Sequence, residues 1–536
     1  MNVATRRASR SAGARTPARA DRRDVAVVVG PVLLAAALSL FQLTDRSLQF
    51  DEGATAAIVS QHGAALGRAL ARDGGNMSGY YLLMHVLVGR FGDGPWVLRL
   101  PSVGFAALTP GFVAAIALAL WRERRVAAVA AVLCAVSLPL VYWGQTARGY
   151  APMTCLACAS MLAYARFASA VREGRSWRGA ALAWLLVTTA AAYCGFIVVL
   201  IVLVQIIGLA VAPGADARGL RRFAGMIVAL GVLCGPLVVL AARRGSGQLF
   251  WVPKPNQQVD SQVMQSLTAS GLQSTFHRVF TTTPGWIGTS VVLLGLIGFG
   301  VRRWSRGDRT DRSVQWPARL LLAWMVVPGL ATFLVSLVAQ PVFQPRNLLP
   351  SFPAFALALA LGLCDRRLPR WAAALGLGLA LLVRVVPLAA AYGVSPEPWR
   401  AVSARVLTAA RPGDCVAFYP EDARNAFRWY LERARPAVRD RAPRSVLPAV
   451  PWSTTTPYVE IYRTLPAARI AALRGGCTRM WLVSSHEGQQ HGPPLAIRHR
   501  RQWLAFRARL ERVFGRGPRS TSGWASAIHV ELMPGR

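Results

Sequence analysis

Two adjacent carboxylates, Asp51 and Glu52, lie a few residues beyond the first long uncharged segment of the chain, residues 25–44. A segment of about 20 such residues spans a lipid bilayer as a helix. The pair is therefore expected at a membrane surface, where a carboxylate can take the proton of a reacting hydroxyl group. We expect Asp51 to be the base, with Glu52 as the alternative base or as an orienting group. A second interpretation is that the pair only caps a helix beginning near Ala54.

Two arginines, Arg148 and Arg346, each lie just beyond an apolar segment, on the side of the membrane where the acidic pair is expected. Guanidinium groups bind phosphate strongly and stabilise negative charge that develops on a leaving phosphate. Arg384 is a third candidate, because it falls inside the last apolar segment, where ionisable groups usually line a polar cavity or pair with another charge. The alternative for Arg148 and Arg346 is anchoring, since long cationic side chains extend to the membrane surface.

Eleven apolar segments predict membrane-spanning helices: residues 25–44, 97–120, 126–143, 150–165, 179–192, 193–212, 223–242, 286–301, 318–339, 348–364 and 371–391. The composition agrees, because 54% of the 536 residues are hydrophobic and soluble domains usually have about 45–50%. The mean hydropathy is +0.36. The fold class is therefore an α-helical polytopic membrane protein. We divide the uncharged residues 179–212 into two predicted helices at about Tyr193. If they formed a single long helix, every later segment would cross the membrane in the opposite direction, against the distribution of arginines.

The formal net charge of +37 follows this topology. Residues 1–24 hold seven arginines and are expected to form a disordered cytoplasmic tail. With the N-terminus inside, the cytoplasmic segments hold 26 arginines and the outer loops hold 11 basic residues, as the positive-inside rule requires. We therefore expect a multi-pass plasma-membrane protein. The arginines lie between apolar segments rather than along one face, which argues against nucleic-acid binding.

The first outer loop, residues 45–95, is longer than a connection between two helices needs. It contains the acidic pair and a third carboxylate, Asp73. Residues 77–91 within it are apolar but too few to cross a bilayer comfortably. We expect this stretch to lie as a helix at the outer membrane surface.

Residues 393–536 lack long apolar runs and are expected to form an extracytoplasmic α/β domain, packed on the membrane domain of residues 25–392. The predicted helices are residues 397–410, 422–434 and 494–514, and the predicted strands are residues 415–419, 480–485 and 525–532. Residues 434–453 are rich in Arg and Pro and are predicted to form a loop. Cys415 and Cys477 each begin or precede a predicted strand, so we expect a disulfide between them.

Short motifs spread over residues 25–392 resemble those of the GT-C glycosyltransferases. The motifs are Asp51-Glu52, Tyr80-Tyr81-Leu82-Leu83 with His85, Arg99-Leu100-Pro101-Ser102, Gln145-Thr146-Ala147-Arg148-Gly149-Tyr150 and Gln344-Pro345-Arg346-Asn347-Leu348-Leu349-Pro350. The last two are similar to the family's Gln-Glu-Ala-Arg-Pro-Tyr and Pro-Arg-Tyr-Leu-Leu-Pro elements, with Thr146 standing where Glu is common. The resemblance is to the branch with protein O-mannosyltransferases, lipid A aminoarabinose transferases and Rgt-like transferases, in its actinobacterial form.

The resemblance implies an enzyme that moves a sugar, with mannose favoured, from a polyprenyl-phosphate donor to an extracytoplasmic glycan, glycolipid or protein. Arg148, Arg346 and Arg384 are then expected to bind the donor phosphate. A base that takes the acceptor proton and a single displacement at the anomeric carbon give inversion.

Several other side chains could stack on the sugar or guide the lipid: Tyr80, Tyr81, His85, Tyr150 and Lys254. An aromatic belt at the interface explains the tyrosines as well, and Lys254, with Arg243 and Arg244, could meet the donor or stay solvated. No second histidine or carboxylate has ligand spacing to His85. The sequence therefore predicts no cofactor and a metal-independent mechanism, and it leaves the use of a divalent ion open.

Two other classes of function remain open at this level. A transporter or flippase for lipid-linked sugars would use the acidic pair to couple protons or to bind cargo, and inverted repeats or interrupted helices would favour it. A membrane scaffold would use the outer domain to recruit partners. An Asp51→Asn variant separates these classes, since only a transferase loses turnover while it still binds its lipid donor.

Overall fold

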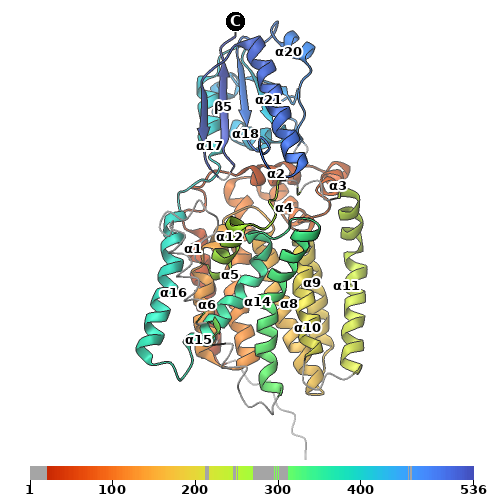
Figure 1. Cartoon of the computed structure of the whole chain (residues 1–536), viewed down its shortest axis with the longest axis vertical. Helices are drawn as coiled ribbons and strands as arrows, with labels where there is room; N and C mark the ends of the chain where they lie inside the picture. The colour runs from red at the N-terminus through yellow and green to blue at the C-terminus, as the bar shows by residue number, and fades with distance from the viewer. Residues whose placement is uncertain are drawn as a thin grey trace, which may run out of the picture.

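The computed structural model describes residues 21–211, 217–245, 249, 251–269, 295, 297–298, 300, 312–456, 458, 461–524 and 526–535. Helices form an elongated body, and a smaller domain with a β-sheet lies at one end of it (Figure 1). The predicted tail up to residue 20 and most of the predicted helix at residues 286–301 lie outside the described residues.

Helices occupy ten of the eleven segments predicted to cross the membrane. They are α1 (Arg22–Leu40), α5 (Pro95–Trp121), α6 (Arg124–Ala135) with α7 (Leu138–Gly144), α8 (Tyr150–Arg172), α9 (Arg178–Cys194), η1 (Phe196–Val198) with α10 (Val199–Ala210), α11 (Ala217–Arg244), α14 (Arg312–Val338), η4 (Pro345–Ser351) with α15 (Phe352–Leu363), and α16 (Arg370–Ala391). Seven of the described helices are long and apolar enough to cross a membrane, and α6 with α7 makes a possible eighth span. The predicted fold class is confirmed.

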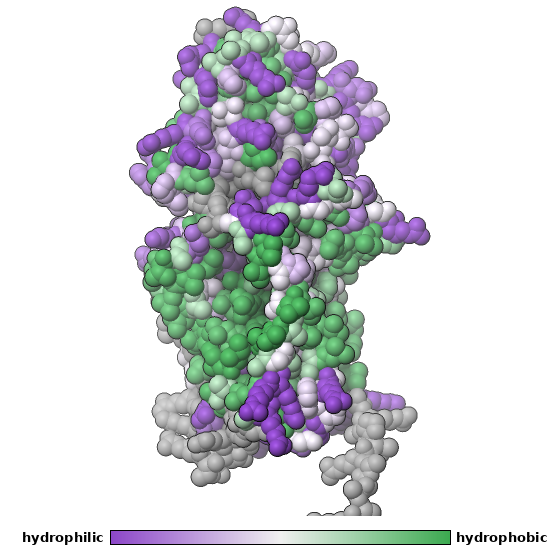
Figure 2. All heavy atoms as spheres, turned by 90° about the vertical axis from the view of Figure 1, so that its right-hand side faces the viewer, coloured by the Kyte–Doolittle hydropathy of each residue, from purple (hydrophilic) through white to green (hydrophobic). Residues whose placement is uncertain are grey.

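The surface of the helical body agrees with a membrane environment. On the face shown in Figure 2, hydrophobic side chains cover the middle of the body, and hydrophilic side chains lie below them, at the end away from the sheet domain. Exposed leucines and valines belong to several helices of the body, among them α1, α11, α14 and α16. Large exposed apolar areas of this kind are rare on soluble proteins and mark contact with lipid or with a partner.

Two breaks divide the apolar runs. The break between α9 and α10 is at Gly195, two residues from the predicted division at Tyr193. A side chain has no room there, because a Cβ at Gly195 would lie 2.3 Å from Met153 Sδ. The second break bends α7 by 56° from α6, and Pro139 lies in the first turn of α7. Proline has no N–H to continue the hydrogen bonds of the preceding helix, but it suits a helix start.

Four shorter helices lie between the membrane helices and the sheet domain (Figure 1). They are α2 (Phe50–Val59), α3 (Gly63–Arg72), α4 (Ser78–Phe91) and α12 (Gln257–Thr268). Helix α4 occupies the apolar stretch predicted to be a surface helix, and its 14 residues are too few to cross a bilayer. Of these, α2 packs directly against α18 (Ala423–Glu432) of the sheet domain, at Gly53 and Ala426.

The sheet has five strands in the order β2-β1-β3-β5-β4. The strands are β1 (Cys415–Tyr419), β2 (Arg444–Leu447), β3 (Met480–Ser484), β4 (Arg519–Ser522) and β5 (Ile528–Met533). Strand β1 is parallel to β2 and to β3, pairing Cys415 with Met480, whereas β5 is antiparallel to β3 and β4. Both faces of β1 and β3 are buried, as is usual for parallel strands that helices cover on two sides.

Helices pack on both faces of this sheet. They are α17 (Trp399–Ala409), α18 (Ala423–Glu432), α19 (Pro436–Arg439), α20 (Ala467–Leu473) and α21 (Pro494–Phe514). One apolar core joins α17 and α18 to alternate residues of β1 and β3, and a second core joins α20 and α21 to the other face. The prediction of a loop at residues 434–453 is wrong at Pro436–Arg439, which form α19, and at Arg444–Leu447, which form β2. Cys415 and Cys477 form a disulfide with a Cα–Cα distance of 5.5 Å.

Candidate active site

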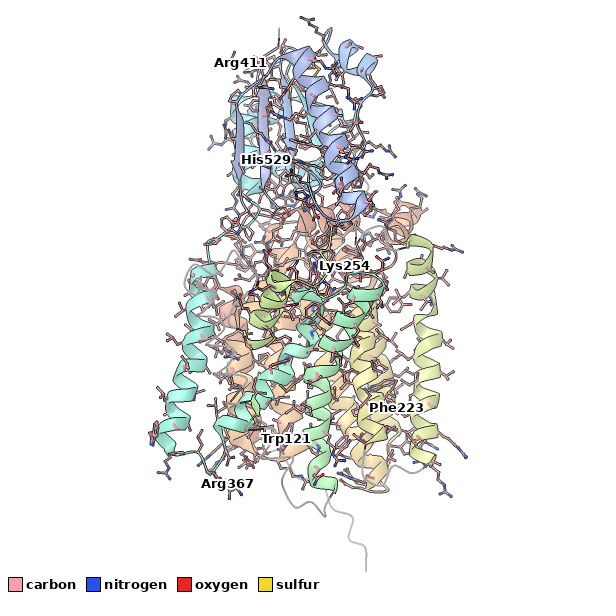
Figure 3. All side chains as sticks on the ribbon, in the orientation of Figure 1. Trp121, Phe223, Lys254, Arg367, Arg411 and His529 are labelled. Carbon is pink, nitrogen blue, oxygen red and sulfur yellow. A yellow bond between two sulfur atoms is a disulfide. The ribbon has the colours of Figure 1, made fainter. Side chains whose placement is uncertain are left out.

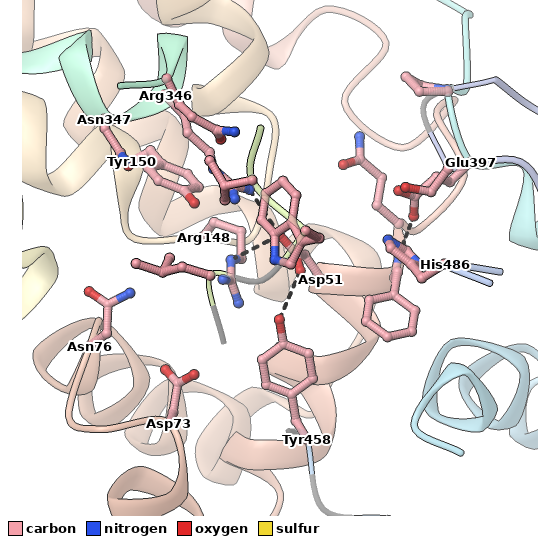
Figure 4. Close-up of a pocket in the computed structure, with 18 of the residues that line it drawn as sticks. Asp51, Asp73, Asn76, Arg148, Tyr150, Arg346, Asn347, Glu397, Tyr458 and His486 are labelled. Carbon is pink, nitrogen blue, oxygen red and sulfur yellow. Dashed lines mark hydrogen bonds and ion pairs between the residues drawn. The ribbon is translucent and has the colours of Figure 1, made fainter. Parts of the chain in front are cut away.

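A cavity of about 540 Å³ lies where the outer helices, η4 and the sheet domain meet (Figure 4). The membrane body contributes Gln49, Phe50, Asp51, Asp73, Asn76, Tyr142, Trp143, Arg148, Tyr150, Arg244, Leu249, Trp251, Val252, Gln344, Arg346 and Asn347, and the sheet domain contributes Pro396, Glu397, Tyr458, His486, Leu495, Arg498, His499 and Ser526. Segments far apart in the sequence therefore meet at one polar cavity. Its arginines and carboxylates make it suited to an ionic ligand.

Asp51 lies in the first turn of α2, at the centre of the group drawn in Figure 4. Its Oδ2 lies 3.6 Å from Arg148 Nε and 4.0 Å from Arg346 Nη1. The Tyr458 hydroxyl donates a hydrogen bond to Asp51 Oδ1 at 3.1 Å. Burial alone would raise the pKa of Asp51, but the two arginines and this hydrogen bond outweigh it and hold the pKa below the ordinary value. The Asp51 carboxylate is therefore ionised at neutral pH.

Arg148 lies in the short loop between α7 and α8, and its side chain is only 7% exposed. Its Nη1 donates a hydrogen bond to the Tyr81 hydroxyl at 2.9 Å. Among the described residues, Arg148 Nε has no hydrogen-bond partner. The next residue, Gly149, lets the loop pack closely, since a Cβ there would lie 2.6 Å from the carbonyl oxygen of Cys194. The loop thus holds a buried cation at the cavity wall, where its Nε faces the Asp51 carboxylate.

Arg346 reaches the cavity from η4. Its guanidinium carbon lies over two aromatic rings, 4.6 Å from the centroid of Trp251 and 5.9 Å from that of Tyr150. Cation–π contacts of this kind favour the charged group and orient it. Trp324 Nε1 donates to the carbonyl oxygen of Pro350 at 3.0 Å and fixes η4 against α14. Arg346 is 23% exposed and therefore remains accessible to a ligand.

Glu52 lies behind the cavity, where its carboxylate binds only protein groups. Its two oxygens accept hydrogen bonds from Arg99 at 2.7 and 2.8 Å. The backbone N–H groups of Ala147 and Gln49 also donate to it, at 2.9 and 3.1 Å. Glu52 is fully buried, so the structure does not support it as an alternative base. It instead connects the start of α2 to the loop that carries Arg148.

The sheet domain holds the start of α2 from the other side. Glu397 Oε2 accepts a hydrogen bond from the Phe50 N–H at 2.7 Å, and the His486 ring lies 4.6 Å from the Phe50 ring. A Cβ at Gly53 would lie 2.7 Å from Ala426 Cα in α18. Helix α2 therefore fits between the membrane body and α18 at a distance that only glycine allows.

Three further titratable groups at the cavity have altered pKa values. Burial, with a smaller contribution from the Asp51 charge, raises the pKa of Asp73 to about 7 and that of Glu397 to about 7. Burial also lowers the pKa of His486 to about 4, although the Asp51 charge opposes this. His486 is therefore neutral at pH 7, and the carboxyl groups of Asp73 and Glu397 are near half-protonation there. Altered pKa values in one cavity are typical of functional sites.

Two of the predicted residues lie away from the cavity inside the helical body. Arg384 is buried in α16, where its Nη1 donates to the carbonyl oxygen of Ala380 at 2.9 Å. Tyr80 is buried in α4 and its hydroxyl lies 3.0 Å from Ser102 Oγ. Neither side chain lines the cavity. The prediction that Arg384 binds the donor phosphate is therefore not supported.

Three other predicted residues have different positions. His85 Nδ1 lies 2.7 Å from the carbonyl oxygen of Val59, and His85 does not line the cavity. Lys254 is exposed, near the junction of the body and the sheet domain (Figure 3), and is likewise not part of the cavity wall. Tyr81 lies behind the wall and binds Arg148. Of the predicted aromatic residues, Tyr150 lines the cavity.

Sequence reasoning did not identify the groups that the sheet domain contributes, Glu397, Tyr458 and His486. They are separated from Asp51 by more than 300 residues, and no motif marks them. Asp73 was noted only as a carboxylate of the outer loop. Among the described residues, no group of three or more His, Cys, Asp or Glu side chains is placed to hold a metal ion.

No protein-family model matches this sequence, and no curated protein matches it significantly. Solved structures are similar in fold. The ArnT structure from Cupriavidus metallidurans in the apo state has a TM-score of 0.54 at 15% identity, covering 94% of this chain and 98% of that one. The oligosaccharyltransferase of Archaeoglobus fulgidus in the apo form has a TM-score of 0.51 at 14% identity, covering 87% of this chain and 70% of that one.

A second structure of the Archaeoglobus fulgidus protein, named AglB, was solved with an inhibitory peptide and a dolichol phosphate. Its TM-score is 0.50 at 13% identity, covering 87% of this chain and 69% of that one. ArnT and AglB are members of the GT-C superfamily. The chain is thus a multi-pass membrane protein with the GT-C fold, as its motifs predict, and the branch within the superfamily stays a prediction.

Proposed function

We propose that this protein is a membrane glycosyltransferase that moves a sugar from a polyprenyl-phosphate donor to a hydroxyl group of an acceptor. The observation that supports it best is the position of the Asp51 carboxylate between Arg148 and Arg346 at one cavity wall. An ionised carboxylate beside two guanidinium groups at the cavity wall supplies a proton acceptor and a phosphate site.

The arginines are the proposed site of the donor phosphate. Arg148 lies beside Asp51 with a buried Nε–H that has no hydrogen-bond partner among the described residues, and Arg346 is held by aromatic rings with part of its guanidinium exposed. Guanidinium groups form paired hydrogen bonds with phosphate oxygens. As the bond between the anomeric carbon and the phosphate breaks, the electron pair passes to the phosphate oxygen, where the two cations stabilise it.

Asp51 is the proposed base. In the unliganded cavity, the arginines keep the pKa of its carboxyl group low, so it is a weak base. A bound phosphate would neutralise part of that positive charge and bring a negative charge close to Asp51. Both effects raise the pKa of Asp51, and the carboxylate becomes a better acceptor for the proton of the attacking hydroxyl group. Attack opposite the phosphate inverts the anomeric carbon.

The structural neighbours support a lipid phosphate as the donor anchor. The Archaeoglobus fulgidus AglB structure contains a dolichol phosphate and an inhibitory peptide, and it has the same fold over 87% of this chain. The cavity here lies next to apolar helices of the membrane body, so a phosphate at Arg148 could keep its lipid chain in the bilayer. Mannose remains the favoured sugar, and the acceptor class stays open among glycans, glycolipids and proteins.

The proposed orientation places the N-terminus in the cytoplasm and the cavity at the outer surface of the plasma membrane, as the distribution of arginines predicts. In this arrangement residues 25–392 form the catalytic membrane domain. Residues 393–536 form an extracytoplasmic domain that contributes one wall of the active site, since Tyr458 and Glu397 contact α2.

An Asp51→Asn variant tests this proposal. We expect it to lose sugar transfer from a polyprenyl-phosphate donor by at least about 100-fold, because general-base catalysis typically contributes 10²–10⁴-fold, and to keep its affinity for polyprenyl phosphate. Asp45→Asn is the matched control, since Asp45 is an exposed carboxylate on the same loop. Unchanged transfer by Asp51→Asn would contradict the proposal. Transport of lipid-linked sugar into vesicles without formation of product would indicate a flippase instead.

A further inference from the structure

Four side chains that line the cavity each carry a buried polar atom without a hydrogen-bond partner in the described part of the chain. These atoms are Asp73 Oδ2, Trp143 Nε1, Arg148 Nε and Arg244 Nε. Buried unpaired groups are costly, and in native proteins water or a ligand usually satisfies them. Three of these atoms are N–H donors, and only Asp73 Oδ2 is an acceptor. A single ligand that satisfies all four must carry both acceptor oxygens and a hydroxyl or amino donor.

A fixed turn places Asp73 in the cavity wall. The residue follows α3, and the turn continues through Gly74 and Gly75, whose φ angles of +70° and +76° favour glycine. A Cβ at Gly74 would lie 2.9 Å from Arg244 Cβ, so the turn packs closely on the end of α11. Asp73 is only 7% exposed. Its carboxyl group is therefore held in place before any ligand binds.

Asp73 is linked to the proposed phosphate site through one hydroxyl group. Arg148 Nη1 donates to the Tyr81 hydroxyl at 2.9 Å. Burial raises the pKa of Asp73, and a hydrogen bond with the same Tyr81 hydroxyl partly opposes this effect. Arg148 and Asp73 thus share the Tyr81 hydroxyl and line the same cavity, so a phosphate on Arg148 would lie on the same part of the cavity wall as the Asp73 carboxyl group. In a polyprenyl-phosphate sugar, the sugar ring is bonded directly to that phosphate.

The polar side chains of the cavity wall lie on two sides of Asp51. Asp73 and Asn76 lie together on one side, and Glu397 and His486 lie on the other (Figure 4). The Glu397 carboxylate already binds the Phe50 N–H, whereas Asp73 Oδ2 has no hydrogen-bond partner among the residues that the structure describes. Of these two carboxyl groups, Asp73 is therefore the one that can accept a hydrogen bond from a ligand.

We infer that Asp73, with the amide of Asn76 beside it, binds hydroxyl groups of the transferred sugar. The inference rests on the proposed function, because it places the sugar next to the phosphate that Arg148 and Arg346 hold. A hydroxyl group of the sugar donates to the Asp73 carboxyl group, and Asn76 can donate to or accept from a neighbouring hydroxyl. Because a site built to bind a hydroxyl group strongly rejects an analogue without it, Asp73 selects among donor sugars.

Binding measurements on the full-length protein in detergent or nanodiscs test this inference. The probes are bare polyprenyl phosphate and the same lipid phosphate carrying mannose, arabinose or galactose. We expect the wild type to bind at least one sugar-bearing lipid more tightly than the bare lipid. Asp73→Asn should weaken that binding by roughly 3- to 10-fold, as expected for loss of one hydrogen bond, and should leave binding of the bare lipid within about twofold.

Asp365→Asn is the matched control. Asp365 is also a buried aspartate, 4% exposed, but it lies two residues before Arg367, at the end of the body away from the cavity (Figure 3). This variant should bind all four lipids as the wild type does. Retained binding of bare polyprenyl phosphate by Asp73→Asn shows that the variant is folded.

Two results would overturn the inference. One is equal binding of the preferred sugar-bearing lipid by Asp73→Asn and the wild type, and the other is a wild type that binds no sugar-bearing lipid more tightly than the bare lipid. Failure of the proposed function has a different outcome, in which the wild type binds neither form of the lipid phosphate. The experiment therefore separates the role of Asp73 from the role of the arginines.

Discussion

At the residue scale, the Tyr458 hydroxyl connects the sheet domain to the proposed base. It donates to Asp51 Oδ1, which favours the ionised carboxylate. Tyr458→Phe removes that donor, so the pKa of Asp51 rises and the acid limb of the kcat/KM profile moves to higher pH. We expect turnover at pH 7 to fall roughly 3- to 10-fold, because the carboxylate loses the hydrogen bond that orients it and this loss outweighs its gain in basicity, with little change in donor KM.

Tyr193→Phe is a suitable control for this variant, since the Tyr193 hydroxyl donates to the Leu233 carbonyl oxygen outside the cavity. A pH profile that does not move in Tyr458→Phe would show that this hydroxyl does not act on Asp51.

Asp73 gives a second prediction at this scale, which concerns stability. Burial raises its pKa in the folded protein to about 7, from 3.8. Between these values the folded state binds more protons than the unfolded state, so this group makes stability fall as pH rises toward 7. Asp73→Asn removes the effect, which has an upper limit of about 4 kcal/mol. Thermal unfolding in detergent should show a larger stabilisation by Asp73→Asn at pH 8 than at pH 5. Equal shifts at the two pH values would contradict the altered pKa.

At the element scale, α2 depends on close packing against α18. A Cβ at Gly53 would lie 2.7 Å from Ala426 Cα, so Gly53→Ala must push the two helices apart. Overpacking of this kind costs about 1–3 kcal/mol, and it also displaces Asp51. We expect lower thermal stability and lower turnover. Gly89→Ala in α4 is the control, because no atom of the described residues lies within 4 Å of a Cβ there and alanine favours a helix. If the two variants behave alike, this packing is not what positions α2.

The disulfide joins the first strand of the sheet to the segment before β3, across 62 residues. A cross-link over a loop of that length is expected to stabilise a fold by about 4 kcal/mol, mainly by restricting the unfolded chain. A Cys415→Ala/Cys477→Ala variant should therefore unfold its sheet domain at lower temperature, measured by limited proteolysis over a temperature range. Cys234→Ala, which removes a free, half-buried cysteine of α11, should change little. Equal protection of both variants would contradict a stabilising role.

At the scale of the whole molecule, most elements could be predicted from the sequence because their signals are local. Apolar runs determine the membrane helices, and the predicted bounds of β1 and α21 match the structure. Strand β2 could not be predicted, because its four residues lie in a segment dominated by Arg and Pro. It is a strand because β1 lies beside it, which is a tertiary cause.

The candidate site was only partly predictable, because some of its contacts form only when distant segments of the chain meet in the fold. Asp51, Arg148 and Arg346 lie in short motifs that resemble a family, and the structure brings them together. Glu52 is buried because it forms an ion pair with Arg99 of another helix. The sequence shows only that Asp51 and Glu52 are adjacent, and it does not reveal that one of them faces the cavity and the other faces Arg99. The contributions of Tyr458 and Glu397 depend on how the sheet domain docks on α2.

A structure of the protein with bound polyprenyl phosphate tests the central claim most directly. We expect the phosphate group within hydrogen-bonding distance of both Arg148 and Arg346, beside Asp51, with the lipid chain leaving the cavity toward the membrane helices. A phosphate group bound elsewhere, for example at Arg384 inside α16, with the arginines of the cavity unchanged, would contradict the account.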